Sequence, residues 1–280
     1  PPGGGEKERA ACGPLFCACY ANLFVLLTSM PHIAAPIAIL SALAEEQAGL
    51  LQHMQGARDV VVAGRTVWCG SLWGQPVVLA LSRIGKVAAA TTATALIAHL
   101  GVSRVFFTGV AGGVGDGVQV GDVVVGTSYV QHDMDASPLF PRYEIPLYGQ
   151  ALFAGDVGLC GALQMASDAA LADIRHQGRA PVVHHGLIAS GDRFVSGAAE
   201  VAGLVGQLRA AGYTPLAVEM EGAAVAQVCA DYGVPFAAVR TISDRADDAA
   251  HRDFRTFVQE VASVYALKII ENLLKSLPKQ

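Results

Sequence analysis

Charged residues are scarce in this chain, and its lysines and arginines form no basic run. Of the 280 residues only 15% are charged, against 52% hydrophobic, and the formal net charge is -5. This composition lacks the clustered positive charge of a nucleic-acid-binding surface, so we expect no nucleic-acid partner. It is sufficient for one large core, and α/β folds of this length often form a single domain.

Several motifs are also absent. The chain contains no internal repeat, no low-complexity tract, and no Cys-x-x-Cys pair among its six cysteines. Cys69, Cys160 and Cys229 lie in strand or helix patterns, and we interpret them as reduced core thiols. The dinucleotide-binding pattern Gly-x-Gly-x-x-Gly leading into a helix does not occur, which argues against a dinucleotide-dependent dehydrogenase.

The first 35 residues follow a different pattern from the rest of the chain. Two basic residues precede an uncharged run over residues 10–31, a pattern typical of a signal peptide or anchor. Glycine, proline and polar residues dilute this run, and the first methionine of the chain is Met30. We therefore interpret residues 1–35 as a disordered or non-native leader. We expect residues 36–280 to form one folded domain in the cytoplasm, with no membrane partner.

Three acids and one arginine concentrate in a strand–helix–strand unit between residues 218 and 244. One apolar run ends in Glu219-Met220-Glu221, a helix rich in alanine and valine follows, and a second apolar run ends in Arg240-Thr241-Ile242-Ser243-Asp244. Side chains just past the carboxyl ends of parallel strands line the ligand crevice of an open α/β sheet. Acids there are costly to bury without a partner, so we predict a ligand site with Arg240 ion-paired to one of its acids.

Each of these residues also has a purely structural interpretation. An aspartate after a strand, such as Asp244, is often a helix cap. Met220 and Phe194 have the chemistry of core residues. Glu45 and Glu46 follow a predicted strand over residues 36–41, and the helix dipole favours acids in a first turn without any function. Taken singly, these residues leave both interpretations open.

Two glycine-containing turns follow predicted strands. Residues 104–113 combine a buried-strand signal with a glycine-rich turn, and residues 82–90 run from a strand through Gly85 into an alanine-rich helix. Glycine lets the backbone approach a ligand closely, but many α/β loops need glycine for geometry alone. Each turn by itself is therefore a weak signal.

In combination, these segments resemble the 5′-methylthioadenosine/S-adenosylhomocysteine nucleosidases, within the nucleoside phosphorylase superfamily. The resemblance covers the chain from Pro36 to the C-terminus, and Glu-Met-Glu with Ile-Ser-Asp is its most specific part. It implies an α/β fold, a single three-layer α/β/α domain around a central mixed, twisted sheet. The matching pieces occur in the family's order: Ile-Ala-Ile-Leu-Ser-Ala-Leu-Ala-Glu-Glu (37–46), Ser-Arg-Ile-Gly-Lys-Val (82–87), Thr-Gly-Val-Ala-Gly-Gly (108–113), Gly-Asp-Val-Val-Val (121–125), His-Asp-Met-Asp-Ala (132–136), Gly-Leu-Ile-Ala-Ser-Gly-Asp-Arg-Phe-Val (186–195), Val-Glu-Met-Glu-Gly-Ala-Ala (218–224) and Val-Arg-Thr-Ile-Ser-Asp (239–244).

The resemblance implies hydrolysis of the N-glycosidic bond of 5′-methylthioadenosine, S-adenosylhomocysteine and related 5′-substituted adenosines to adenine and the thioribose. In the family, the aspartate matching Asp244 protonates a ring nitrogen of adenine, and the glutamate matching Glu46 polarises the attacking water. The ribosyl group meanwhile resembles an oxocarbenium ion, as in glycoside hydrolysis. Arg240 matches an arginine near the water and the glutamate, so we expect it to orient them.

The resemblance also implies the substrate-binding residues. Glu221 would bind the ribose hydroxyls, Met220 would pack on the ribose, and Phe194 would stack on adenine. Val195 would meet the edge of adenine through backbone groups, and Ser243 would support the catalytic aspartate. The other predicted substrate-binding residues are Glu219, Ile84, Ala111, Gly112 and Phe254. We expect no cofactor and no metal, because the resemblance makes the metal-like cluster at residues 132–135 a structural strand end.

Two other functions stay open at this point. A phosphate-dependent purine nucleoside phosphorylase of the same superfamily would need cationic groups around phosphate, where this chain has Glu45 and Glu46. A non-catalytic nucleoside-binding protein could share the fold. The presence of both Glu46 and Asp244 argues against that second alternative.

The chain departs from the family pattern at three places. Val110 stands where many relatives carry serine, which removes a hydroxyl near the attacking water. Arg83 stands where glycine is usual, and we expect its side chain to point to solvent. Residues 138–149 differ from the relatives in length and composition. In the family this region comes from the neighbouring subunit to close the 5′ pocket, and its apolar side chains predict a homodimer.

Overall fold

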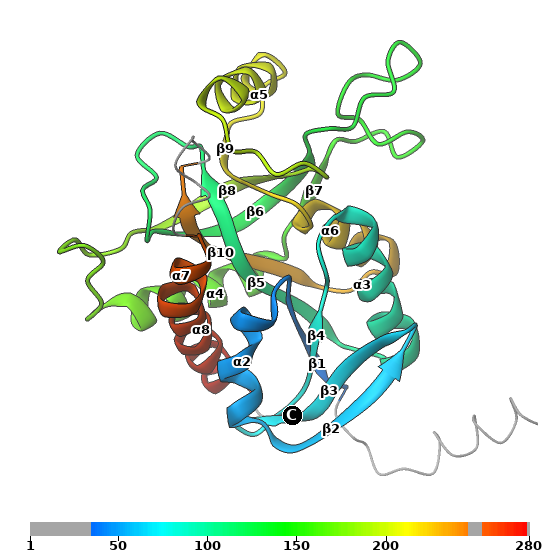
Figure 1. The fold of residues 1–280 in the computed structure, drawn as a ribbon. Helices are drawn as coiled ribbons and strands as arrows, with labels where there is room; N and C mark the ends of the chain where they lie inside the picture. The colour runs from blue at the N-terminus through cyan, green and yellow to red at the C-terminus, as the bar shows by residue number, and fades with distance from the viewer. Residues whose placement is uncertain (1–34, 246–253, 279–280) are drawn as a thin grey trace, which may run out of the picture. The chain divides into compact units, whose positions relative to one another are not determined.

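The computed structural model describes residues 35–245 and 254–278 (Figure 1). The predicted leader, apart from Ala35, lies outside the described residues. The strands are β1 (Ile37–Ser41), β2 (Gln55–Val62), β3 (Arg65–Leu72), β4 (Gln75–Leu81), β5 (Arg104–Gly113), β6 (Val123–Gln131), β7 (Leu152–Ala154), β8 (Val183–Ser190), β9 (Pro215–Glu219) and β10 (Phe236–Asp244). The helices are α2 (Ala44–His53), α3 (Lys86–Leu100), α4 (Val157–Leu171), α5 (Ala198–Ala210), α6 (Gly222–Tyr232), α7 (Phe254–Phe257), the π-helical η1 (Val258–Ala262) and α8 (Ser263–Ser276).

Within the described residues, ten strands form one mixed sheet, and part of it closes on itself. The hydrogen-bonded order is β10-β6-β8-β9-β5-β1-β4-β3-β2, with β7 paired to β6. Because β10 also pairs with β5, the strands β5, β10, β6, β8 and β9 form a ring of neighbours. β9 meets β5 only at Gly112 and Gly113 in an antiparallel pairing. The closure therefore brings the ends of β5, β9 and β10 together.

Helices cover both faces of the sheet, which confirms the predicted three-layer arrangement (Figure 1). Ile39 and Phe106 belong to the core shared with α2, α4 and α8. Their sequence neighbours Leu40 and Phe107 belong to the core shared with α3 and α6. Successive side chains of a strand point to opposite faces, so strands buried on both faces need continuous apolar runs. This requirement explains the short hydrophobic segments of the sequence.

β3 and β4 form a hairpin with its turn at residues 73–74. The described C-terminal helix consists of consecutive α7, η1 and α8, with a π-helical turn between its two α-helical parts. None of the helices in the described ranges is long and apolar enough to cross a membrane.

Candidate active site

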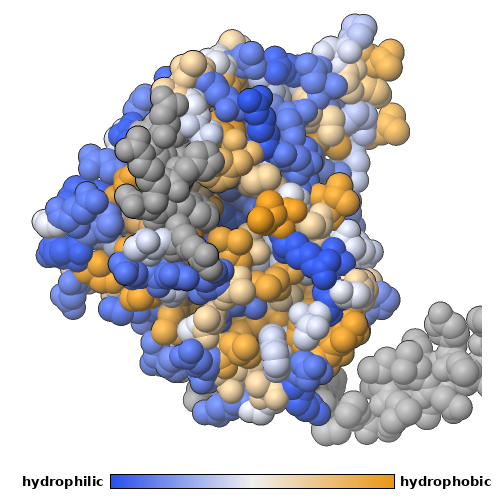
Figure 2. Space-filling view, in the orientation of Figure 1, coloured by the Kyte–Doolittle hydropathy of each residue, from blue (hydrophilic) through white to orange (hydrophobic). Residues whose placement is uncertain are grey.

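A pocket opens where the ends of β1, β5, β9 and β10 meet. Every predicted site residue lines it except Phe254, which begins α7 and whose side chain lies outside the described part of the chain. The face shown in Figure 2 is hollowed near its centre, with hydrophobic residues at the rim. The pocket also includes residues for which the sequence suggested no role, namely Ala42, Leu43, Phe107, Gly109, Arg193 and Val218.

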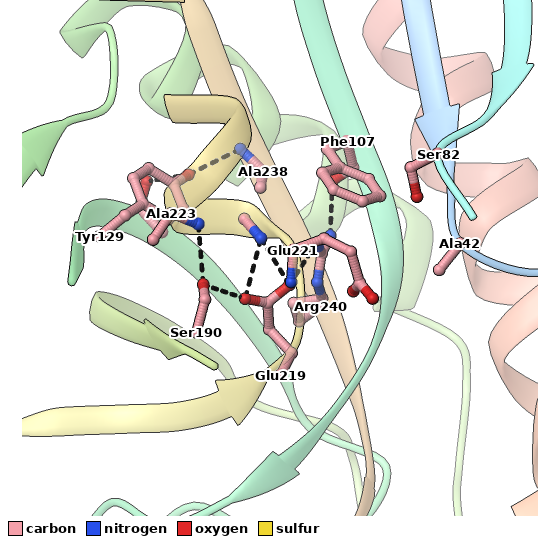
Figure 3. A network of polar contacts seen from close by, with 12 residues as sticks. Ala42, Ser82, Phe107, Tyr129, Ser190, Glu219, Glu221, Ala223, Ala238 and Arg240 are labelled. Atoms are coloured by element: carbon pink, nitrogen blue, oxygen red, sulfur yellow. Dashed lines mark hydrogen bonds and ion pairs between the residues drawn. The ribbon is translucent and has the colours of Figure 1, made fainter. Parts of the chain in front are cut away.

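Glu219 ends β9 and is held by the start of α6 (Figure 3). Its Oε1 and Oε2 accept hydrogen bonds from the Gly222 N–H at 3.0 and 2.9 Å, and Oε2 accepts another from the Glu221 N–H at 3.2 Å. Ser190 Oγ donates to Oε1 and itself accepts from the Ala223 N–H at 2.7 Å. Free N–H groups and the helix dipole make a helix start a favourable place for a carboxylate.

Arg240 of β10 is the positive partner of Glu219, so the expected ion pair is present. Its Nη2 donates to Glu219 Oε2 at 2.8 Å, and both side chains are almost completely buried. Its Nη1 donates to the carbonyl oxygens of Phe107 at 3.0 Å and Val239 at 3.1 Å. Burial lowers the pKa of the guanidinium, but the neighbouring carboxylates, Glu219 first, outweigh burial and raise the pKa. Arg240 is therefore a fixed positive charge.

Glu46 both stands at a helix start and lines the pocket. It is the third residue of α2, and its Oε2 accepts from the backbone N–H groups of Ala42 at 3.0 Å and Leu43 at 2.9 Å, as an acid at a helix start does. Its Oε1 is buried and makes no hydrogen bond of ordinary geometry among the described residues, although the Val110 N–H lies close to the carboxyl. Burial raises the pKa of this carboxyl, whereas the Leu43 N–H, the charge of Arg240 and the Val110 N–H act in the opposite direction.

Gly109 makes room for this carboxyl. It lies on β5 directly opposite Arg240 of β10. A Cβ added at Gly109 would lie 3.2 Å from Glu46 Oε1 and 3.7 Å from Arg240 Cζ. Only a residue without a side chain lets the carboxyl and the guanidinium approach the strand this closely without displacement.

Glu221 lies two residues after Glu219 but is held differently. Its Oε1 accepts a single backbone hydrogen bond, from the Gly85 N–H at the start of α3, at 2.8 Å. Burial, followed by the charge of Glu219, raises the pKa of Glu221 to about 8. Its carboxyl therefore takes up a proton near neutral pH and can donate as well as accept hydrogen bonds.

A β-bulge at the end of β10 places two polar residues in the pocket. The register with β5 shifts between Ile242 and Asp244, and both Ser243 and Asp244 line the pocket. Ser243 Oγ lies 2.6 Å from Asp244 Oδ2 and 3.4 Å from the Ala111 carbonyl oxygen, so the hydroxyl donates to the carboxyl group of Asp244. β-bulges next to active sites commonly redirect side chains in this way.

The apolar walls come from three other segments. Phe194 lines the pocket and is 42% exposed, which excludes the interpretation of Phe194 as a core residue. Val195 beside it is buried, and Met220 and Ile84 line other parts of the pocket. Among the departures from the family pattern, Val110 lines the pocket. Arg83, by contrast, is exposed, does not line the pocket, and donates from Nη2 to the Gly64 carbonyl oxygen at 3.2 Å.

Comparison with known proteins agrees with the predicted resemblance. The sequence profile of the Phosphorylase superfamily matches residues 36–275. A 5′-methylthioadenosine/S-adenosylhomocysteine nucleosidase of Shewanella denitrificans is 34% identical over 236 residues, which cover 84% of this chain and 96% of the relative. The chain belongs to the 5′-methylthioadenosine/S-adenosylhomocysteine nucleosidase family of the phosphorylase superfamily.

Solved structures of the family share the fold. The Neisseria meningitidis nucleosidase, crystallised with methylthio-immucillin-A, is 35% identical with a TM-score of 0.78, and the match covers 87% of this chain and all of that one. The futalosine hydrolase of Helicobacter pylori is 32% identical with a TM-score of 0.76, covering 88% of this chain and all of that one. The fold class predicted from the sequence is therefore confirmed by the family's solved structures as well.

Proposed function

We propose that the protein hydrolyses the N-glycosidic bond of 5′-methylthioadenosine, S-adenosylhomocysteine and related 5′-substituted adenosines, releasing adenine and the thioribose. The observation that carries the proposal is the buried Glu46. One of its oxygens is fixed by two backbone N–H groups, and the other makes no hydrogen bond of ordinary geometry among the described residues. The relatives support the substrate class, because those compared in sequence are named for it and the Neisseria structure holds a methylthio-substituted analogue.

In the proposed reaction, Glu46 Oε1 accepts a proton from water as the water oxygen forms a bond to C1′ of the ribose. The bond from C1′ to the adenine nitrogen breaks, and its electron pair leaves on adenine. Asp244 supplies the proton that a ring nitrogen of adenine takes up. Burial raises the pKa of Glu46, which makes its carboxylate a stronger base towards water. Arg240, fixed by Glu219, orients the water and the base.

The substitution Asp244→Asn tests the proton donor. An amide has no acidic proton to deliver, so adenine release should fall by about 10²–10⁴-fold, the range for loss of an acid–base group. Asp168→Asn, on the exposed side of α4, is the matched control and should retain the parent rate. Near-parent turnover by Asp244→Asn would exclude this residue as the proton donor.

The remaining pocket residues bind the substrate in this proposal. Glu221 binds the ribose hydroxyls, Met220 packs on the ribose, and Phe194 stacks on adenine beside Val195. Glu219 acts differently, because both of its oxygens already accept protein hydrogen bonds. We therefore assign Glu219 to holding Arg240 rather than to touching the substrate. The support for these roles is the position of each residue in the pocket wall.

A phosphate-dependent reaction is disfavoured by the charges in the pocket. The two arginines that line the described pocket are each ion-paired, Arg240 with Glu219 and Arg193 with Glu200. A phosphate would instead meet the carboxylate of Glu46, whose negative charge would repel it. The test is adenine release from methylthioadenosine, adenosylhomocysteine, futalosine and adenosine, with and without phosphate. Release that requires phosphate and yields a ribose 1-phosphate would overturn the hydrolase proposal.

We also propose a homodimer formed through residues 138–149. Within this segment Leu139 and Leu147 are 84% and 91% exposed, and apolar side chains exposed near one another mark surfaces that contact other proteins. Ile145, which had also suggested a contact between subunits, is instead buried in its own chain. Sedimentation should give a dimer, and Leu139→Ser together with Leu147→Ser should shift it to monomer. A parent protein that sediments as an active monomer would contradict this proposal.

For location we propose the cytoplasm. The support is that Cys69, Cys160 and Cys229 are free thiols in the described residues, which suits a reducing compartment. Fractionation of the source cells should recover the activity with cytoplasmic markers. Recovery with secreted or membrane fractions would contradict the proposal.

A further inference from the structure

Three charged residues of the family motifs take no part in the chemistry described above. Lys86 lies in the segment 82–87, Asp133 in the segment 132–136, and Asp192 in the segment 186–195. None of the three lines the pocket. They come from distant parts of the chain, yet the fold brings them into contact.

Lys86, Asp133 and Asp192 form a closed ring of polar contacts, called here the Lys86 ring. The Lys86 backbone N–H donates to Asp192 Oδ1 at 2.7 Å, and the Asp192 backbone N–H donates to Asp133 Oδ2 at 2.9 Å. Lys86 Nζ donates to Asp133 Oδ1 and completes the ring. Nζ also donates to Gln131 Oε1 at 3.0 Å, so the ammonium is anchored on β6.

The charges strengthen this ring. Burial alone raises the pKa of Asp133, but the hydrogen bonds from Lys86 and from the Asp192 N–H outweigh burial and hold the pKa below its ordinary value. Asp133 is therefore ionised at neutral pH, and its contacts are charge-assisted hydrogen bonds. Such bonds are shorter and stronger than those between neutral groups. The Lys86 side chain is only 14% exposed, which limits its screening by solvent.

The Lys86 ring connects two walls of the pocket. Lys86 begins α3 directly after Gly85, whose N–H donates to Glu221, so two consecutive N–H groups at this helix start bind Glu221 and Asp192. Asp192 precedes Phe194 by two residues. Gly85 has φ +94°, and a Cβ there would lie 3.1 Å from Asp192 Oδ1. The turn and the segment that carries Phe194 thus approach each other closely.

The segment that carries Phe194 is also supported from β6. Gly191 begins it, and a Cβ at this position would lie 2.3 Å from the His132 ring. The His132 N–H donates to the Ser190 carbonyl oxygen at 2.9 Å. These contacts fix the beginning of the segment, and the Lys86 ring fixes Asp192, the next residue along the chain.

We infer that Lys86, Asp133 and Asp192 are positioning residues, whose ring sets Phe194 relative to Glu221 and so fixes the spacing between the adenine and ribose subsites. The inference rests on the proposed function, in which Phe194 and Glu221 contact those two parts of one substrate. The ring touches neither Glu46 nor Asp244. Loss of the ring should therefore weaken substrate binding and leave the chemical step intact. A raised KM with an unchanged kcat is expected when a variant loses binding that the ground state and the transition state share.

The test uses Lys86→Met, Asp133→Asn and the double variant of the full chain. Each single substitution should raise KM by about tenfold, because the loss of one charge-assisted hydrogen bond can cost this much in free energy. The kcat of each variant should stay within about threefold of the parent value. The double variant should resemble the worse single variant instead of giving the roughly hundredfold product, because both changes open the same ring. Lys275→Met, which breaks an exposed ion pair on α8, is the matched control.

Hydrogen exchange of the peptide covering residues 186–197 provides a readout that needs no substrate. Exchange there should be faster in both single variants than in the parent, and unchanged in Lys275→Met. Parent-like KM and exchange in Lys86→Met and Asp133→Asn would overturn the inference, and so would a fall in kcat alone. If the parent itself releases no adenine, the proposed function fails, and the exchange measurement still decides whether the ring holds the segment.

Discussion

The starts of α2 and α6 each hold a buried glutamate by backbone N–H groups, but the two acids are left in different states. At α6, both oxygens of Glu219 accept hydrogen bonds and Arg240 supplies the opposite charge. At α2, only one oxygen of Glu46 is satisfied by the helix start. Burial of a carboxyl without full pairing is costly, and of these two acids Glu46 is the one that carries this cost. The difference separates an acid that holds the site from an acid that can react in it.

The largest expected effect comes from Glu46→Gln, which removes the reacting acid and keeps its shape. Adenine release should fall by about 10²–10⁴-fold, because an amide cannot accept the proton of water. Stability should not fall at a pH where Glu46 is ionised, because a carboxyl with a raised pKa destabilises the fold in its ionised form. Turnover and melting temperature are measured on the same samples.

Glu45→Gln is the control for that substitution, since Glu45 lies in the same helical turn and does not line the pocket. Its turnover should equal that of the parent. If Glu46→Gln loses activity only because the variant is unfolded, then Glu46 supports the fold as Glu219 does, and the proposed difference between these two acids is wrong.

The next effect is on stability and comes from Glu219→Gln. Breaking a buried ion pair leaves Arg240 as an uncompensated charge and should reduce the free energy of unfolding by about 3–5 kcal/mol. Denaturant unfolding measures the loss. Glu271→Gln, which breaks an exposed pair with Lys275, should cost at most about 1 kcal/mol. If Glu219→Gln unfolds at the parent's midpoint, Glu219 is not the anchor of the site.

Glu221 is intermediate between Glu46 and Glu219, and its contribution to stability depends on pH. Its pKa in the fold is about 8, above the ordinary 4.5, so the folded state holds this proton more tightly than the unfolded chain does. The corresponding stability is present below 4.5 and is lost as the pH rises through about 8. Glu221→Gln should therefore lose less stability than the parent over this window. The melting temperatures of the two proteins are measured as a function of pH. If both fall equally between pH 4.5 and about 8, the raised pKa of Glu221 is contradicted.

The local sequence pattern identifies the acids, whereas their reacting roles follow only from the family resemblance. Glu46, Glu221 and Asp244 end apolar runs, and that pattern is enough to predict a polar site. Whether Glu46 caps a helix or faces a pocket depends on where its second oxygen points, which spacing along the chain does not determine. In the structure the same side chain does both, because its Oε2 accepts hydrogen bonds at the helix start and the residue lines the pocket.

The predicted site residues, apart from Phe254, line one pocket, but the sequence pattern brings them together on an incomplete geometric basis. It treated the ends of β9 and β10 as carboxyl ends of strands in an open parallel sheet, yet these strands are not neighbours. They meet because β10 pairs with both β5 and β6, which closes the sheet. Pairing between strands far apart in the chain leaves no local signal in composition or periodicity. The bulge at Ser243 and the contacts of Ser190 with Glu219 are long-range features of the same kind.

The smallest expected effect is on kcat and comes from Gly109→Ala, which tests the position of Glu46 without changing any acid. In Gly109→Ala the new methyl group would lie 3.2 Å from Glu46 Oε1, so the carboxyl must shift by a few tenths of an ångström. A small displacement of a reacting group lowers the rate, and kcat should fall by roughly threefold to tenfold. Gly206→Ala on α5, where an added Cβ meets nothing within 4 Å, is the matched control and should keep the parent kcat. An unchanged kcat in Gly109→Ala would show that the position of Oε1 is not critical, and the reactive role assigned to that oxygen would then be wrong.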